Sequence, residues 1–182
     1  MSDALRRTMF TLAAACAVMG ARPAHAGFKA HARSFECLLE GTKPEGKNFY
    51  VFHRNRRKLA RAVAIAESGA PGDTYPVGTI LQLFPFEAMV KRGGRFNPEG
   101  HGWEFFKLRV DDQNRTTIVA RGGSEVTNLF GSCQGCHMTG EAPQFDLVCE
   151  DHGAIRLPLD AATIQEVQDS DRRCQKPAEE PR

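Results

Sequence analysis

Short runs of branched, aromatic and other apolar residues fill the middle of the chain, and clusters of turn residues separate them. Runs of this length favour β-strands, whereas Gly, Pro, Asn and Asp favour the turns between strands. The predicted strands are residues 48–53, 78–86, 87–92, 102–110 and 116–121. Because short connections join strands that are neighbours in the sheet, the pattern predicts an antiparallel meander.

Helix-forming residues dominate two segments that flank these strands. Residues 54–69 are expected to form a helix that Gly69 ends, and residues 158–174 a C-terminal helix that Asp160 caps. Between them, residues 123–137 are expected to be helical in short pieces, and "FDLV" at 145–148 to be a strand. The predicted fold class is therefore α+β, with helices packed on an antiparallel sheet in a single domain.

The N-terminus has the pattern of a secretory signal. Arg6 and Arg7 precede an apolar run at 9–19, and Ala24-His25-Ala26 gives an A-x-A cleavage site. The run is shorter than the roughly 20 residues of a membrane span, and no later segment approaches that length. We therefore expect a periplasmic protein, cleaved after Ala26, without a transmembrane anchor. The predicted division is signal peptide 1–26, lead-in 27–47, main domain 48–159, and C-terminal helix and tail 160–182.

Composition and charge narrow the classes of partner. Cleavage would take 24 basic and 22 acidic residues to 21 of each, because Arg6, Arg7, Arg22 and Asp3 are removed. The basic stretch "HRNRRKLAR" at 53–61 contains no aromatic residue of the kind that stacks on bases. A solvated helix face is the favoured interpretation of this stretch, and no nucleic-acid partner is expected.

The residues with the most specific chemistry are "CQGCH" at 133–137. In a Cys-x-x-Cys-His motif the two thiols add to the vinyl groups of a haem, and the adjacent His binds the iron. Cys133 and Cys136 would then form the thioethers of one haem c, and His137 would be the proximal iron ligand. Because bacteria attach such haems after export, the signal supports this interpretation independently.

Two other interpretations of the motif remain open. Cys133, Cys136, Cys149 and His152 have the spacing of a structural zinc site in a secreted domain. The Cys-x-x-Cys pair could also exchange disulfides, although the surrounding chain lacks the alternating strands and helices of such proteins. If a haem takes two of the five mature cysteines, one disulfide and one free thiol remain among Cys37, Cys149 and Cys174, with the pairing open.

The other side of a haem iron would decide the function. A second His or a Met there would give an electron carrier, whereas an empty apolar site would bind a small ligand. Met138 is next to His137 and cannot reach the opposite face. The candidates for a sixth ligand are Met89, Met138, His53, His101 and His152. Aromatic residues on the predicted strands favour an enclosed apolar pocket, and they are Phe84, Phe86, Trp103, Phe105 and Phe106.

Residues 75–108, "YPVGTILQLFPFEAMVKRGGRFNPEGHGWEFFKL", followed by "CQGCH" and "FDLV", resemble the cytochrome P-460 superfamily, which includes the cytochromes c′-beta. The elements Gly78-Thr79, "EAMVK", "RFNPEG", "GWEFF" and "CQGCH" come in the family's order, and the similarity spans residues 48–150. The resemblance implies an antiparallel-sheet protein, commonly a homodimer. It also implies one c-type haem with His137 as proximal ligand and an open distal side.

One departure from the family changes the expected activity. In the cytochromes P-460 a Lys cross-linked to the haem accompanies hydroxylamine oxidation, but the matching position here is at or next to Leu83, and Lys91 does not match it. We therefore expect a protein that binds nitric oxide or a similar ligand, or passes single electrons to a partner. A hydroxylamine oxidoreductase is the alternative, so whether the chain is an enzyme stays open. The distal-pocket candidates are Leu83, Phe84 and Phe86, and the candidate proton-transfer residues are Glu87 and Glu104.

Overall fold

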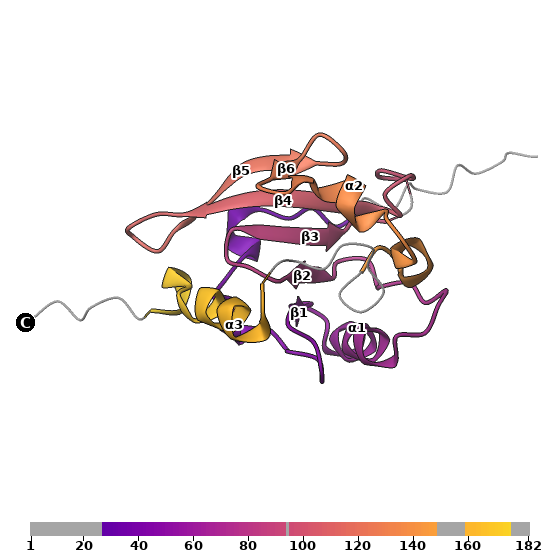
Figure 1. The fold of residues 1–182 in the computed structure, drawn as a ribbon, viewed down its shortest axis with the longest axis horizontal. Helices are drawn as coiled ribbons and strands as arrows, with labels where there is room; N and C mark the ends of the chain where they lie inside the picture. The colour runs from indigo at the N-terminus through magenta and orange to yellow at the C-terminus, as the bar shows by residue number, and fades with distance from the viewer. Residues whose placement is uncertain (1–26, 94, 149–158, 176–182) are drawn as a thin grey trace, which may run out of the picture.

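A five-stranded antiparallel sheet forms the centre of the protein, in the order β1-β2-β3-β4-β5 (Figure 1). The computed structural model describes residues 27–93, 95–148 and 159–175. The strands are β1 Tyr50–Phe52, β2 Ile80–Gln82, β3 Glu87–Lys91, β4 Trp103–Val110 and β5 Thr116–Gly122. Because each strand pairs with its neighbour in sequence, the predicted meander and the α+β class are confirmed.

The predicted strand 78–86 is too long, because β2 ends at Gln82. Beyond it the chain turns back towards β3. The side-chain amide of Gln82 donates to the carbonyl oxygens of Phe84 and Glu87 at 3.4 and 3.3 Å, and so stabilises this turn. Pro85, which lacks a backbone N–H, lies at the same place.

Gly69 ends the first of the two longer helices and Asp160 caps the second, as predicted. α1 (Arg56–Ser68) begins where the Asn55 side chain accepts from Lys58 N, and it ends at Gly69, whose φ of 54° is left-handed. α3 (Ala161–Asp169) begins where Asp160 accepts from Thr163 N at 2.7 Å. α3 is shorter than predicted, and a separate 3₁₀ turn, η4 (Arg172–Cys174), follows it.

Two local predictions around the cysteine motif are wrong. Residues 123–132 contain a small hairpin instead of a helix, with strands β6 (Thr127–Asn128) and β7 (Gly131–Ser132). "FDLV" is not a strand, because the 3₁₀ turn η3 (Ala142–Phe145) runs into it and the next two residues have φ of 54° and 66°. Those two residues, Asp146 and Leu147, make long-range contacts that hold the irregular backbone.

The sheet has a hydrophobic core on each face. Cross-strand partners point to the same face, so Val51, Leu81, Met89 and Phe105 share one side with Trp103. Apolar residues of α1 pack there, and we call this side the motif face. The opposite side, the rear face, carries Phe106. The rest of its core comprises Ala30, Phe35, Ile80, Ala88, Val90 and Leu108.

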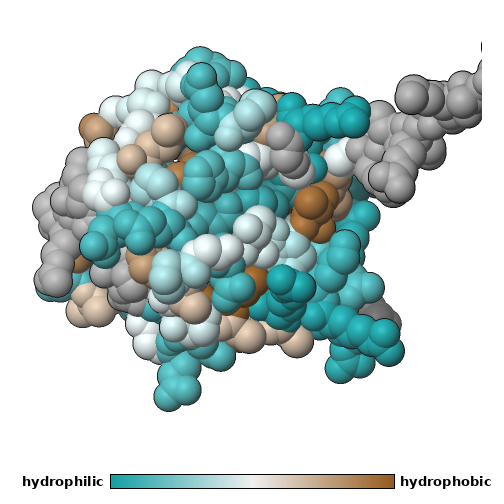
Figure 2. All heavy atoms as spheres, turned by 90° about the vertical axis from the view of Figure 1, so that its right-hand side faces the viewer, coloured by the Kyte–Doolittle hydropathy of each residue, from teal (hydrophilic) through white to brown (hydrophobic). Residues whose placement is uncertain are grey.

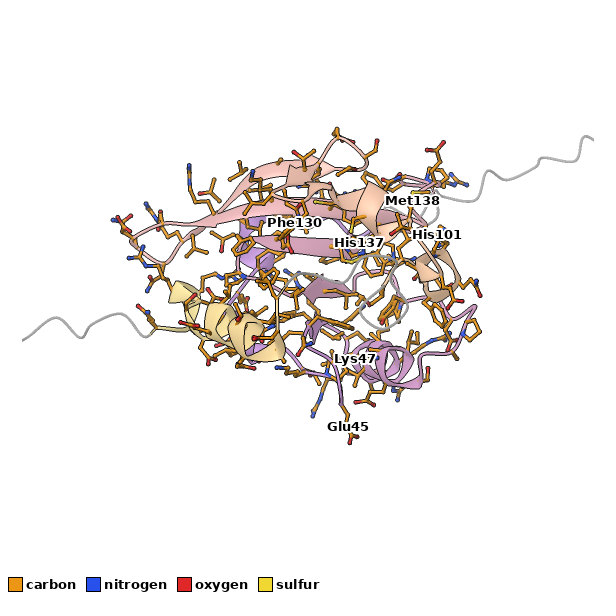
Figure 3. The ribbon with its side chains drawn as sticks, viewed as in Figure 1. Glu45, Lys47, His101, Phe130, His137 and Met138 are labelled. Atoms are coloured by element: carbon orange, nitrogen blue, oxygen red, sulfur yellow. A yellow bond between two sulfur atoms is a disulfide. The ribbon has the colours of Figure 1, made fainter. Side chains whose placement is uncertain are left out.

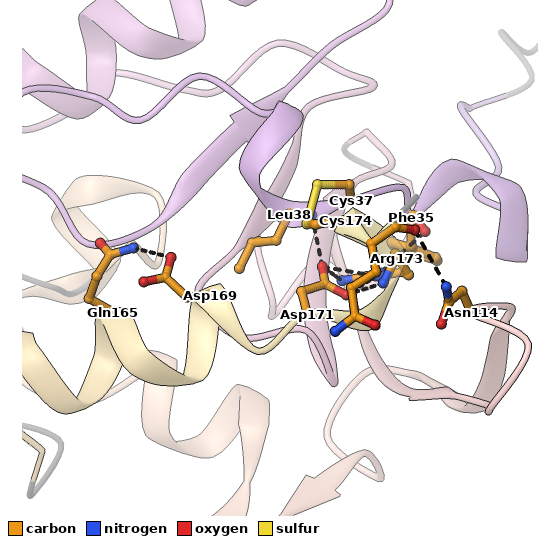
Figure 4. The surroundings of a disulfide bond; sticks show 10 residues. Phe35, Cys37, Leu38, Asn114, Gln165, Asp169, Asp171, Arg173 and Cys174 are labelled. Carbon is orange, nitrogen blue, oxygen red and sulfur yellow. Dashed lines mark hydrogen bonds and ion pairs between the residues drawn. A yellow bond between two sulfur atoms is a disulfide. The ribbon is translucent and has the colours of Figure 1, made fainter. Parts of the chain in front are cut away.

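A disulfide joins the N-terminal segment to the end of the described chain. Residues 27–47 contain the 3₁₀ turns η1 (Ala32–Ser34) and η2 (Leu38–Glu40). Cys37, immediately before η2, is bonded to Cys174 in η4 (Figure 4). Beside it the buried Asp171 carboxylate accepts from Leu38 N at 2.8 Å and pairs with Arg173. The structure therefore shows the Cys37–Cys174 bond, one of the three disulfides that the sequence allowed. Cys149 lies outside the described residues.

Most of the surface drawn in Figure 2 is hydrophilic, and hydrophobic residues on that side form small separate areas. Within residues 27–93, 95–148 and 159–175 no helix has the length and hydrophobicity needed to cross a bilayer. The predicted signal peptide lies outside these residues.

Candidate functional site

The Cys-x-x-Cys-His motif forms a single short helix, α2 (Cys133–His137), directly after the β6–β7 hairpin. The Ser132 side chain caps it by accepting from Gly135 N at 3.1 Å. Cys133 N donates to Val126 O at 3.0 Å, which ties the helix to the start of the hairpin. One turn of helix thus carries both thiols and the imidazole.

The two motif thiols lie beside the motif face and are not joined to each other. Cys133 packs against the hydrophobic core of that face, and Cys136 is partly exposed. Burial and, to a lesser extent, the nearby Glu87 carboxylate raise the pKa of the Cys133 thiol to about 11. The same two causes raise the pKa of Cys136. A disulfide exchanger needs an attacking thiol with a lowered pKa, so this environment does not favour that interpretation.

His137 is held by a backbone carbonyl ten residues further along the chain. Its Nδ1 lies 2.6 Å from Leu147 O, and its ring centroid lies 5.3 Å from that of Phe105. When Nδ1 donates to a carbonyl, the neutral ring carries its lone pair on Nε2, the nitrogen that can bind a metal. Burial lowers the pKa of His137, although the bond to Leu147 opposes this effect, so the neutral form is favoured.

The two candidate carboxylates lie on opposite faces of the sheet. Glu87 opposes Lys107 on the motif face, where its Oε2 accepts from Asn128 Nδ2 at 3.1 Å, and burial raises its pKa. Glu104 opposes Val90, a rear-face residue, and is almost fully buried in ion pairs with Arg92 and Arg121. Because side chains alternate between the two faces along β4, Glu104 points away from the motif, which corrects the expectation for this residue. Of the two candidate carboxylates, only Glu87 lies near the thiols.

The three distal-pocket candidates lie in the turn between β2 and β3 but differ in their surroundings. Leu83 packs against the motif-face core, and its carbonyl accepts from Gln168 Nε2 at 2.9 Å. Phe84 is buried and stacks on Phe86 at 5.2 Å between centroids, whereas Phe86 is 46% exposed. Leu83 is thus the candidate that the structure brings to the motif face.

The candidates for a sixth ligand are spread over the molecule. Met89 is buried on the motif face opposite Phe105. His101 Nδ1 lies 3.6 Å from Asp146 Oδ1, next in the chain to Leu147, the partner of His137. Met138 directly follows His137 (Figure 3), and its sulfur accepts from Gln134 Nε2 at 3.4 Å. His53 instead bonds to Val77 O and Asn55 N at the start of α1. His152 lies outside the described residues.

A buried ion pair behind the motif was missed from the sequence. Lys91 Nζ lies 2.5 and 2.7 Å from the carboxylate oxygens of Asp146, and both side chains are almost completely buried. Asp146 immediately precedes Leu147, the partner of His137. The sequence signal was weak: a Lys in an apolar strand pattern and an Asp in a short apolar run.

The described residues do not test the zinc interpretation of the motif. Among the described side chains no group of three or more His, Cys, Asp and Glu lies close enough to hold a metal ion. Cys149 and His152, half of the expected zinc set, lie outside the described residues.

Comparisons with known proteins add no assignment. No protein-family model matches the chain, and neither the curated proteins nor the solved structures contain a match to it. The resemblance to the cytochrome P-460 superfamily therefore stays a prediction from the residues that carry it.

Proposed function

We propose that this chain is an exported c-type haem protein that binds nitric oxide or a similar small ligand, or transfers single electrons. The observation that carries the proposal is the His137 bond to Leu147 O, which directs the imidazole as a proximal haem ligand requires. The motif places this ring on the same turn of helix as two unpaired thiols.

The donor set of α2 fits a covalent haem. Cys133 and Cys136 would provide the two thioethers, and His137 Nε2 would bind the iron. Partly buried thiols beside an apolar core suit a hydrophobic macrocycle. A bound haem supplies an iron that takes up a diatomic ligand or a single electron.

The apolar side chains of the motif face would limit the access of water to such a ligand. Leu83, Met89 and Phe105 belong to or pack on this core and offer no charged group. An apolar, poorly hydrated site favours a small neutral ligand such as nitric oxide over an anion.

Glu87 gives the hydroxylamine-oxidising alternative its one supporting observation. This carboxyl lies on the motif face, and burial raises its pKa, so it can hold a proton nearer to neutral pH than an exposed Glu. Glu87 would then be the proton-transfer residue of an oxidoreductase acting on hydroxylamine. The absence of a Lys at Leu83 places the ligand-binding function first.

The decisive experiment is to produce the full chain in cells that mature c-type cytochromes and to measure the haem that stays bound after denaturation. We expect one covalent haem per chain and a change in the ferrous absorption spectrum when nitric oxide is added. A Cys133→Ala/Cys136→Ala variant should lose covalent haem. A Cys149→Ala/His152→Ala variant should keep it if the motif binds haem. Wild-type protein without covalent haem, but with zinc that this second variant loses, would replace the proposal by the zinc interpretation.

A further inference from the structure

Behind the proximal candidate His137, a charged pair is buried in the motif-face core. Lys91 comes from the end of β3 and Asp146 from the segment after η3, 55 residues later. Lys91 Nζ also donates to His101 O at 2.7 Å and lies 4.9 Å from the Trp103 ring centroid. The ammonium is therefore enclosed by groups that suit a cation.

Asp146 is fixed at both its side chain and its backbone. One carboxylate oxygen accepts from Tyr75 N at 2.9 Å, in addition to the bonds from Lys91. The Asp146 carbonyl accepts from Trp103 Nε1 at 2.6 Å. At the other end of the same peptide unit, Leu147 N donates to Ala142 O at 2.8 Å. Because both ends of this peptide unit are hydrogen-bonded, the position of Leu147 has little freedom.

That next residue is Leu147, whose carbonyl oxygen accepts from His137 Nδ1. Asp146 and Leu147 both have left-handed φ values, of 54° and 66°, which non-glycine residues rarely adopt. Such a conformation persists only where the surroundings over-determine it. The backbone N–H groups of Asp146 and Leu147 both donate to Ala142 O and hold this conformation locally. The Lys91 ion pair and the Trp103 bond add long-range contacts that fix it relative to the sheet.

A purely stabilising role explains this pair poorly. Burying two charges carries a large desolvation cost, and apolar side chains of similar size often replace a buried pair without loss. An ion pair that fixes the direction of the hydrogen bond between His137 and Leu147 has a role that an apolar pair could not fill.

We infer that Lys91 and Asp146 are positioning residues that hold the Leu147 carbonyl on His137 Nδ1, and thereby set the strength of His137 as a ligand to haem iron. This inference rests on the proposed haem function. A carbonyl acceptor at Nδ1 increases the basicity of the other ring nitrogen, which strengthens the bond to the metal and favours the oxidised state. Loosening the pair should therefore raise the reduction potential and weaken the iron–His bond.

The test uses haem-loaded full-length protein with Asp146→Asn or Lys91→Met. Asn accepts the left-handed conformation and keeps one oxygen for Tyr75 N, so Asp146→Asn removes the charge and one of the two oxygens that accept from Lys91 Nζ. Glu104→Gln is the matched control, because it removes the charge of a similarly buried carboxylate that is ion-paired on the same sheet but on the rear face. The readouts are covalent haem content, the iron–His stretching band of the ferrous protein and the midpoint potential.

We expect all three variants to carry haem. The two motif-face variants should have a higher potential and a lower iron–His stretching frequency than wild type, whereas Glu104→Gln should match wild type. Unchanged values in Asp146→Asn, or equal shifts in Glu104→Gln, would overturn the inference. If Asp146→Asn does not fold, Lys91→Met is judged by the same criteria, since it leaves the Tyr75 and Trp103 bonds in place. Wild-type protein without haem would instead refute the proposed function.

Discussion

Cys37 and Cys174 are joined by a disulfide although 137 residues separate them in the chain. The bond ties the segment before β1 to the turn that follows α3, next to the buried Asp171–Arg173 pair (Figure 4). The two ends of the described chain are thus held together at one place on the fold.

Replacing Cys37 and Cys174 by Ser should lower the free energy of unfolding by about 2 to 5 kcal/mol, because a long loop of the unfolded chain is no longer closed. Denaturant unfolding of oxidised wild type and the double variant measures this difference. The single variants should lose as much as the double variant. A double variant as stable as wild type would show that the bond does not form in solution.

Trp103→Phe should destabilise the protein by about 1 to 3 kcal/mol, because the Asp146 carbonyl loses its buried donor. Equilibrium unfolding in urea is the measurement. A loss well below about 1 kcal/mol would mean that the Trp103 bond contributes little to holding the segment before Leu147.

Asp160 caps α3 with an ionised carboxylate, and its bonds to Thr163 lower its pKa. A folded pKa below the unfolded value gives stability that is present above the unfolded value, about 3.9, and is lost as the pH falls through the folded pKa. Asp160→Ala should therefore lower Tm at neutral pH and converge with wild type in acid.

Asp160→Asn is the control for this titration, since Asn is an equally good cap but does not titrate. Its Tm should stay close to that of wild type at neutral pH. Thermal unfolding followed across the acid range checks both variants, and an Asp160→Ala loss that persists unchanged in acid would contradict the titration.

Glu104→Gln should cost about 3 kcal/mol, because Arg92 and Arg121 keep their charges on the rear face without a carboxylate. Its nitric oxide binding should equal that of wild type once haem is loaded. Unfolding in denaturant and ligand titration measure the two effects separately. If haem-loaded Glu104→Gln binds nitric oxide more weakly than wild type, Glu104 would again be a candidate site residue.

His137→Ala should keep covalently bound haem but lose the proximal ligand, with a changed ferrous spectrum that added imidazole restores in part. His101→Asn is the control, since His101 is nearby and Asn tolerates its left-handed φ of 51°. The absorption spectra of the two variants make the comparison. An altered spectrum in His101→Asn with a normal one in His137→Ala would reverse the assignment.

The parts of the fold that depend on neighbouring residues were predictable. The strand order follows from short connections, and Asp160 and Gly69 define helix ends through local hydrogen bonds and backbone preference. The motif thiols and His137 were predicted as a haem site because haem attachment fixes their spacing, and the structure has them on one helix.

The parts that depend on distant residues were not predictable. "FDLV" has the composition of a strand, but the contacts of Asp146 with Lys91 and Trp103, on β3 and β4, override that preference. The separation of Glu87 from Glu104 depends on the register between β3 and β4, which composition alone does not give.

The order of elements along the chain has a consequence for assembly. All five strands of the sheet precede Cys133, so a chain synthesised from its N-terminus can complete the sheet before either motif thiol appears. Pairing between consecutive strands is also the faster kind to form. Cys174 follows all of these strands, so the disulfide that joins the two ends can close only after every strand of the sheet has been synthesised.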